Sequence, residues 1–293
     1  MPEPAIVVVY GDSGRGKSVD ALYTVPDALY LTPAPGGLAA ATRLTGVEPR
    51  EQRVNTIEHA CKVLRETKGI HSVVLDDFSV LAERTHLSFD STGRGGWDVW
   101  KRLQRSVMNL REIAIERGLT LVMNAHVSPP KTDDGGNSIP GGPKMPSKAM
   151  TMALPHVATL VLRAVNDPFL SAPRWPGRYA CDPTNAQWVT KDRYVVIQGG
   201  KAPQNVREIL WAAKAHGHDV VVPKRPQGLE ALDDLAESLA QGFRSGALSS
   251  PQEARKAIAT QRGKFPPHVL HWAWRDGCAR SDLAADDLFA DLT

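Results

Sequence analysis

The sequence predicts an α/β domain of three layers, with helices on both faces of a mainly parallel sheet. Short runs of β-branched and other apolar residues alternate with segments in which apolar residues recur at helical spacing. This alternation is typical of parallel sheets, because parallel strands need a long crossover connection, which a helix supplies. Hydrophobic residues make up 42% of the 293 residues and charged residues 23%, so the chain can bury a sizeable core.

The first part of the chain contains three expected strands and two expected helices. The strands are residues 6–10, 28–32 and 71–76, and the last of them ends on a carboxylate. A short helix is expected from Lys17 to about Tyr23, and Pro26 stops it. A longer helix is expected at residues 55–58 and beyond, because Asn-Thr-Ile-Glu has the form of a capping box.

The alternation continues through the second half. A long amphipathic helix is expected from Trp100 to Ala114, with Gly118 closing it. Further strands are expected at residues 119–123, 157–165, 178–181 and 195–198, and a helix is expected to begin at Pro203. Residues 128–147 are loop-like and rich in Gly and Pro, and loops of this length are typically functional or disordered.

The character of the sequence changes after residue 224, where strand-like runs stop. We therefore expect a core at residues 1–224 and a helical appendage at residues 225–293. Basic residues surround Trp272 and Trp274 in the appendage, which suits either the core of a small helical bundle or nucleic acid binding. The final residues are acidic and apolar, which suits a tail that docks on a partner or a frayed last helix.

The composition argues against several other classes of protein. No apolar run approaches the roughly 20 residues that a membrane-spanning helix needs, and no signal peptide is visible. Cys61, Cys181 and Cys278 lie far apart, which suits a reducing compartment and shows no metal-ligand spacing. We therefore expect a cytoplasmic protein without a membrane partner. The net charge of +3 does not by itself indicate nucleic acid binding.

The first expected strand runs directly into a phosphate-binding sequence. Residues 11–18 match Gly-x-x-x-x-Gly-Lys-Ser at every fixed position. In such a P-loop the glycines let backbone N–H groups turn toward the phosphates, and the lysine reaches the β- and γ-phosphate oxygens. ATP is therefore expected to bind to Gly11, Asp12, Ser13, Gly14, Arg15, Gly16, Lys17 and Ser18.

The expected ATP site also needs Mg²⁺, for which the sequence offers two ligands. Ser18 supplies a hydroxyl, and Asp76 supplies a carboxylate at the end of an apolar strand. The alternative for Asp76 is a cap of the turn that follows. Asp77 either orients or deprotonates the attacking water, or it is simply solvated.

The order of these motifs resembles that of the RecA-like ATPases over about residues 5–215. Within them, the chain is similar to phage-encoded single-strand annealing recombinases with a RecA-like core, on the evidence of residues 24–26, 188–194 and 202–209. The Lys-Asp-Arg-Tyr segment that begins at Lys191 is also similar to a motif of RadA-type branch-migration ATPases. The resemblance implies a three-layer RecA-like P-loop fold and, for a phage-encoded protein, a location in the cytoplasm of a bacterial host.

The resemblance implies further roles for single residues. His126 would detect the γ-phosphate from a strand tip, unless it is a core or capping histidine. Lys191 and Arg193 would reach the nucleotide of a neighbouring subunit in a ring or filament, unless they form surface ion pairs. The expected partners are therefore further copies of the chain, ssDNA and a single-strand-binding protein. The expected DNA contacts, in the loop of residues 128–147 or just beyond it, are Lys131, Lys144 and Lys148.

One feature departs from the RecA-like pattern. These ATPases commonly have a glutamate after the second strand that positions the hydrolytic water, but residues 32–37 contain no carboxylate. Either Asp77 takes over this role, or hydrolysis is slow and ATP mainly favours assembly. The leading functional hypothesis is a slow ATPase that binds ssDNA and promotes annealing or strand exchange. The alternatives are a helicase or branch-migration motor, and a nucleotide-regulated assembly protein without DNA chemistry.

Overall fold

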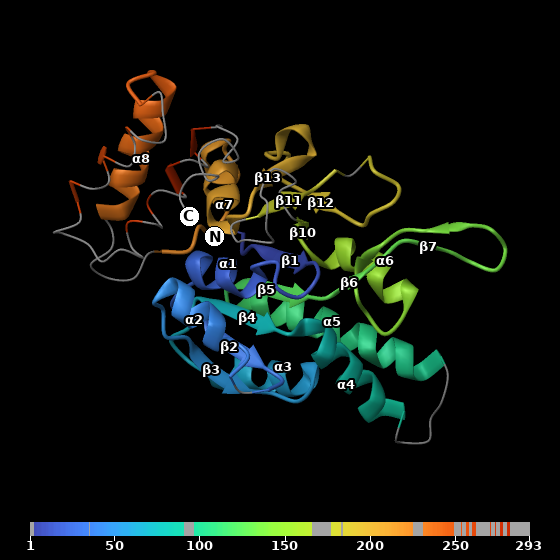
Figure 1. Ribbon diagram of the computed structural model, residues 1–293. Helices are drawn as coiled ribbons and strands as arrows, with labels where there is room; N and C mark the ends of the chain where they lie inside the picture. Colours follow the sequence, from blue (N-terminus) through green and yellow to red (C-terminus); the bar gives the residue numbers. More distant parts are fainter. Residues whose placement is uncertain are drawn as a thin grey trace.

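The centre of the molecule is a mainly parallel sheet, seen in a computed structural model of the chain (Figure 1). The structure describes residues 3–34, 36–90, 97–165, 177–182, 184–224 and 231–248, and residues 253, 256–257, 260–261, 270, 273, 276–277 and 280–281. Within this part of the chain the sheet has nine strands, in the order β13-β11-β10-β1-β5-β4-β2-β3, with β12 also paired to β10. The expected α/β class with a mainly parallel sheet is therefore confirmed.

The parallel strands occupy the middle of the sheet and one of its edges. They are β1 (Ile6–Tyr10), β2 (Leu29–Thr32), β3 (Arg50–Arg53), β4 (Ser72–Asp76), β5 (Thr120–Ala125) and β10 (Leu160–Val165). Three short antiparallel strands complete the other edge, namely β11 (Arg178–Ala180), β12 (Lys191–Asp192) and β13 (Lys201–Pro203). Because the parallel strands share one direction, their carboxyl ends meet at the same edge of the sheet, where β1 leads into residues 11–18.

Helices cover both faces of the sheet, because alternate strand residues point to opposite sides. On β1, Ile6, Val8 and Tyr10 belong to one buried cluster, and Val7 and Val9 belong to the other. The first cluster includes residues of α3 (Ile57–Glu66), α4 (Phe78–Asp90), α5 (Trp97–Glu116) and α6 (Lys148–Val157). The second includes residues of α1 (Lys17–Thr24), α2 (Ala39–Thr45), α7 (Val206–Ala215) and α8 (Ala231–Arg244). These are the three expected layers.

The loop of residues 128–147 is more ordered than its composition suggests. It contains two small antiparallel ladders, β6 (Val127–Ser128) with β9 (Gly142–Pro143), and β7 (Lys131–Thr132) with β8 (Ser138–Ile139). The Asp133 carboxylate accepts the backbone N–H groups of Gly135 and Asn137, which closes the turn at the tip. Figure 1 shows this hairpin extending away from the body of the protein.

The expected strand at residues 195–198 is wrong. The Asp192 carboxylate accepts the backbone N–H groups of residues 194–197, so these groups fold around it in a turn instead of pairing in the sheet. A 3-10 turn at Gln198–Gly200 follows and leads into β13. A side chain from outside the apolar run therefore overrides the strand preference of that run.

The boundary expected at residue 224 remains a prediction. On its C-terminal side, α8 places Leu232 in the buried cluster that also contains residues of α1 and α7. The structure does not describe Trp272, Trp274 or the acidic residues 282–293, so the expectations for the appendage and its tail lie outside the described part of the chain. No helix within the described residues combines the length and the apolar character needed to cross a membrane.

Candidate functional site

The phosphate loop connects β1 to α1 at the carboxyl end of the sheet. Gly14 and Gly16 have φ values of +76° and +72°, a left-handed conformation that glycine adopts without a steric penalty. Gly11 has no room for a side chain, because a Cβ there would lie 2.7 Å from the carbonyl oxygen of Ala164 on β10. Gly16 precedes α1 and has no side chain to cap it, so the N–H groups of the first helical turn remain turned toward the loop.

Lys17 spans the phosphate loop. Its Nζ atom donates to the carbonyl oxygens of Gly11 at 2.9 Å and of Asp12 at 2.8 Å. Burial lowers the pKa of Lys17, while the charges of Asp76 and Asp77 act to raise it. The site thus holds an ammonium group beside the loop and places carboxylates close enough to favour its charged form.

Asp76 ends β4 beside the loop, and the Ser18 hydroxyl is close enough to favour the charged form of its carboxylate. Burial raises the pKa of Asp76, and the Ser18 hydroxyl and the charge of Lys17 act in the opposite direction. The two residues expected to bind Mg²⁺ therefore lie close together. A hydroxyl and a carboxylate are oxygen ligands of the kind that Mg²⁺ prefers.

Asn124 is a site residue that the sequence analysis did not identify. It lies on β5 between β1 and β4, level with Val9 on one side and Asp76 on the other. Its amide favours the charged form of Asp76, yet neither amide atom makes a hydrogen bond of good geometry, although the residue is 1% exposed. A buried amide without good partners costs free energy, and a hydrated Mg²⁺ ion or a phosphate oxygen would supply them. The residues present therefore fit Mg²⁺ and a nucleoside triphosphate.

Asp77 has two partners and is not simply solvated. Its Oδ1 atom accepts the backbone N–H of Ser79 at 2.9 Å, which caps the start of α4. Its Oδ2 atom lies 2.5 Å from Nε2 of His126. The backbone N–H of His126 in turn donates to the Ser79 hydroxyl at 2.9 Å. The structure thus brings Asp77 and His126 together, while their expected roles in hydrolysis and γ-phosphate sensing remain predictions.

His126 also contacts the stem of the protruding hairpin. Its carbonyl oxygen accepts the backbone N–H of Lys144 at 2.7 Å, and β6 begins at the next residue. Lys131, Lys144 and Lys148 are all exposed, and Lys148 is close enough to Asp133 to help lower the pKa of that carboxyl, after hydrogen bonds from Asn137. The backbone contact between His126 and Lys144 therefore connects the phosphate site to the segment that carries these exposed lysines. DNA contact by the lysines remains a prediction.

Lys191 and Arg193 lie far from the phosphate loop of their own chain. Asp192 between them pairs with Leu160 at the beginning of β10, whereas Tyr10, the residue before the loop, pairs with Arg163. The two residues therefore lie toward the amino ends of the parallel strands, and the loop follows their carboxyl ends.

Both side chains have partners within the chain. Lys191 donates to the carbonyl oxygens of Pro155 at 2.5 Å and Ala158 at 2.9 Å, at the end of α6. Arg193 forms an ion pair with Glu3 at 2.7 Å, and its side chain is half exposed. A contact of Arg193 with nucleotide therefore requires a second copy of the chain, and this contact remains a prediction.

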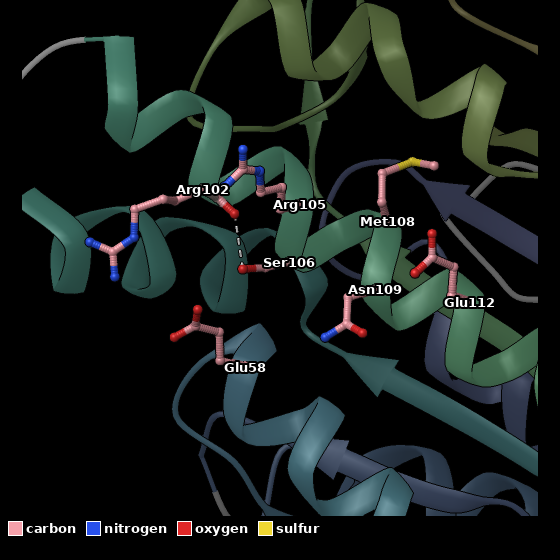
Figure 2. Close-up of a pocket in the computed structure, with 7 residues that line it drawn as sticks. All are labelled: Glu58, Arg102, Arg105, Ser106, Met108, Asn109 and Glu112. Carbon is pink, nitrogen blue, oxygen red and sulfur yellow. Dashed lines mark hydrogen bonds between the residues drawn. The ribbon is translucent and has the colours of Figure 1, made fainter.

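A separate cavity of about 390 Å³ lies between α3 and α5 (Figure 2). It is lined by Glu58, Arg102, Arg105, Ser106, Met108, Asn109 and Glu112. These helices pack on the sheet face opposite α1. The cavity is therefore not part of the phosphate site, and its balanced arginines and glutamates indicate no particular ligand.

Comparisons with known proteins leave the function to be argued from the site. No protein-family model matches the chain, and no curated protein matches its sequence. Solved structures that resemble it include a crystal structure of the RadB recombinase, with 15% sequence identity and a TM-score of 0.42, over 69% of this chain and 87% of that chain. A likeness of this degree supports no conclusion about activity or partners.

Proposed function

We propose that the protein binds ATP with Mg²⁺ at residues 11–18 and hydrolyses it slowly, as a RecA-like ATPase. The meeting of Lys17, Ser18 and Asp76 at the carboxyl ends of β1 and β4 supports this proposal most directly. Lys17 binds the β- and γ-phosphate oxygens, and Ser18 and Asp76 hold the ion directly or through water. The ion neutralises charge on the phosphates, and Asn124 completes the polar lining.

Asp77 and His126 suit the hydrolytic step. Asp77 is fixed by the backbone N–H of Ser79, so its second oxygen has a defined direction. A γ-phosphate that accepts a hydrogen bond from His126 competes with Asp77 for that imidazole. The released carboxylate oxygen is then available to orient or deprotonate water. Asp77 must first lose its contact with His126 before it can act as a base, which is in keeping with slow turnover.

We further propose that the partner is ssDNA and that the protein acts as a homo-oligomer promoting annealing or strand exchange. The contact of His126 with Lys144 links the phosphate site to the hairpin with the exposed lysines. Lysines on such a surface bind phosphates by releasing counterions, so the affinity should fall as salt rises. In such an oligomer Arg193, which lies away from the phosphate loop of its own chain, would act on the nucleotide of a neighbouring subunit.

The test is ssDNA binding with and without ATP and Mg²⁺, for the wild type and Lys17→Ala. Lys62→Ala is the matched control, because Lys62 is an exposed lysine on α3, paired only loosely with Glu66 at 4.0 Å. Binding that requires ATP in the wild type and the control, and is lost in Lys17→Ala, supports the proposal. Unwinding of duplex DNA coupled to hydrolysis would instead indicate a motor. Absence of any salt-sensitive ssDNA affinity would indicate an assembly protein without DNA chemistry.

A further inference from the structure

Gln204 contacts the phosphate loop from a distant part of the chain. Its Nε2 atom donates to the carbonyl oxygen of Arg15 at 2.6 Å, and its Oε1 atom accepts the backbone N–H of Gly177 at 2.7 Å. The residue is 1% exposed and lies between β13 and α7. One side-chain amide therefore connects the loop to the backbone just before β11. Its N–H group binds the loop, and its oxygen binds the backbone before β11.

The contact with Arg15 determines the direction of a neighbouring N–H group. In a planar trans peptide the carbonyl oxygen and the following N–H point in opposite directions. Since Gln204 holds the oxygen of Arg15, the N–H of Gly16 points away from Gln204. Glycine at this position has wide conformational freedom, so the Arg15–Gly16 peptide could otherwise rotate. The hydrogen bond from Gln204 removes that freedom before any ligand binds.

The residues around Gln204 hold it in register with the loop. The backbone N–H of Val206 donates to Asp20 on α1 at 3.2 Å, and the Tyr179 hydroxyl donates to the same carboxylate at 2.5 Å. Asp20 is itself buried. The start of α7 is thus joined both to the loop and to the helix that follows the loop, so Gln204 cannot shift independently of either.

We propose that Gln204 is a positioning residue for the phosphate loop, which orients the Gly16 N–H toward the nucleotide phosphates. This inference rests on the proposed binding of ATP at the loop and extends it to a residue outside the loop. Gln204 itself does not touch the nucleotide. Its effect on affinity comes from the preorganised donor, because the loop does not need to be ordered when the phosphate arrives.

The test compares two neighbouring amide-to-acid substitutions. Gln204→Glu keeps an acceptor for Gly177 but places a carboxylate oxygen against the carbonyl of Arg15. Asn205→Asp is the control, because Asn205 is equally buried and its Nδ2 atom donates to Asp276, away from the loop. Gln204→Met is the second variant, because methionine has a side chain of similar length but forms neither the hydrogen bond to Arg15 nor the one to Gly177. Affinities are measured for ATP and for inorganic tripolyphosphate, and thermal unfolding reports the stability of each variant.

We expect both Gln204 variants to bind ATP and tripolyphosphate on the order of tenfold more weakly than the wild type. Asn205→Asp should bind both ligands like the wild type, even where its stability falls as much as that of the Gln204 variants. Trypsin cleavage after Arg15 in the nucleotide-free protein should be faster in the Gln204 variants alone.

Two results would overturn the inference, and they are distinguishable. Wild-type affinity and wild-type cleavage in both Gln204 variants would exclude a positioning role while leaving ATP binding intact. A wild-type protein that binds neither ATP nor tripolyphosphate would exclude the proposed function together with the inference.

Discussion

Asp76 is a carboxyl group whose charged form is disfavoured by burial. Burial raises its pKa, and the contacts with Ser18, Lys17 and Asn124 only partly offset this effect. The carboxylate therefore binds a proton more readily than an exposed one does. A proton and Mg²⁺ compete for the same oxygens, because only the ionised carboxylate is a metal ligand. This competition gives the proposed metal role of Asp76 a measurable pH dependence.

Substitution Asp76→Asn should abolish the increase in ATP affinity that Mg²⁺ causes in the wild type, a loss of at least about tenfold. ATP affinity in EDTA should not fall, because the substitution removes a negative charge near the phosphates. In the wild type, the Mg²⁺-dependent increase should decline on acidification at a higher pH than an ordinary aspartate would give, since the folded-state pKa is raised. Calorimetric titrations with and without the ion, across pH, measure all three effects. An unchanged Mg²⁺ effect in Asp76→Asn would exclude Asp76 as a ligand.

Substitution Asp77→Asn separates the two contacts of that side chain. The amide oxygen can still accept the N–H of Ser79, so the cap of α4 and the stability should be nearly preserved. The carboxylate that faces His126 is lost, and hydrolysis should fall about 100-fold or more at unchanged ATP affinity. The test measures single-turnover hydrolysis and equilibrium ATP binding for both the wild type and Asp77→Asn. Equal turnover in the wild type and Asp77→Asn would show that Asp77 only caps α4 and has no part in hydrolysis.

Among the proposed site residues, the sequence predicts those whose position follows from local spacing. The phosphate loop occupies eight consecutive positions, and Asp76 follows an apolar run, so both are visible without coordinates. Asn124 and Gln204 could not be recognised in this way, because their proposed roles rest on strand register and on a contact across 189 positions. A polar residue at the end of a buried strand was the available signal for Asn124.

At the scale of elements, the turn after β12 shows why an apolar run was misjudged. Val195 has a φ of +55° and is 79% exposed, which is unfavourable for a β-branched residue. The Asp192 carboxylate holds this turn by accepting four successive backbone N–H groups. The buried parallel strands were predicted well, because burial on both faces gives them continuous apolar runs. A turn fixed by one carboxylate has no such pattern. The exposed parallel strand β3 was not predicted, because its sequence, Arg-Glu-Gln-Arg, has no apolar residue.

The same turn presents Arg193, and its expected action in trans can be tested by mixing variants. Arg193→Ala subunits can bind ATP but supply no arginine, whereas Lys17→Ala subunits supply the arginine but bind ATP poorly. If Arg193 acts on a neighbour, the mixture should hydrolyse more ATP than the two proteins do separately.

Glu3→Gln is the matched control for this experiment. It breaks the same surface ion pair, worth about 1 kcal/mol or less, and leaves Arg193 in place. It should therefore hydrolyse ATP like the wild type. Full activity of Arg193→Ala alone would show that the arginine is dispensable, and equal losses in Arg193→Ala and Glu3→Gln would assign the effect to the ion pair.

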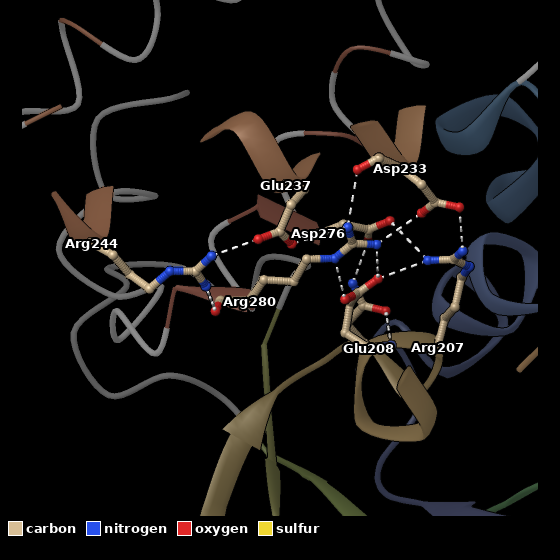
Figure 3. Close-up of polar contacts among 8 residues, drawn as sticks. Arg207, Glu208, Asp233, Glu237, Arg244, Asp276 and Arg280 are labelled. Carbon is tan, nitrogen blue, oxygen red and sulfur yellow. Dashed lines mark hydrogen bonds and ion pairs between the residues drawn. The ribbon is translucent and has the colours of Figure 1, made fainter. Parts of the chain in front are cut away.

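At the scale of the whole molecule, a buried charge cluster joins the C-terminal region to the core (Figure 3). Arg280 contacts Glu208 on α7 and Asp233 on α8, both at 2.8 Å. Arg207 contacts the same two carboxylates at 2.8 Å and lies 3.6 Å from Asp276. Two arginines thus hold three carboxylates from α7, α8 and the chain beyond residue 270, so each charge depends on the others for compensation.

Loss of one partner from such a cluster should be far more costly than loss of an exposed pair. Arg280→Met leaves Glu208 and Asp233 undercompensated, and we expect a loss of about 3–5 kcal/mol in the free energy of unfolding. Arg244→Met is the control for an exposed pair, because the Arg244 side chain is 46% exposed and its pair with Glu237 should contribute about 1 kcal/mol or less. Its other hydrogen bond goes to the backbone carbonyl of Arg280, which Arg280→Met retains. Urea unfolding measures both changes.

The same variants show whether the C-terminal region influences the phosphate site. Glu208 belongs to the helix whose start is joined to Asp20 and to the loop, so a loosened cluster has a short path to the nucleotide. However, Asp20 holds the first residue of α7 without help from Arg280. We therefore expect Arg280→Met to release α8 to proteolysis while the ATP affinity of the remaining folded protein stays within about twofold of the wild type. A parallel loss of ATP affinity would show that the cluster is needed to hold α7 against the phosphate site.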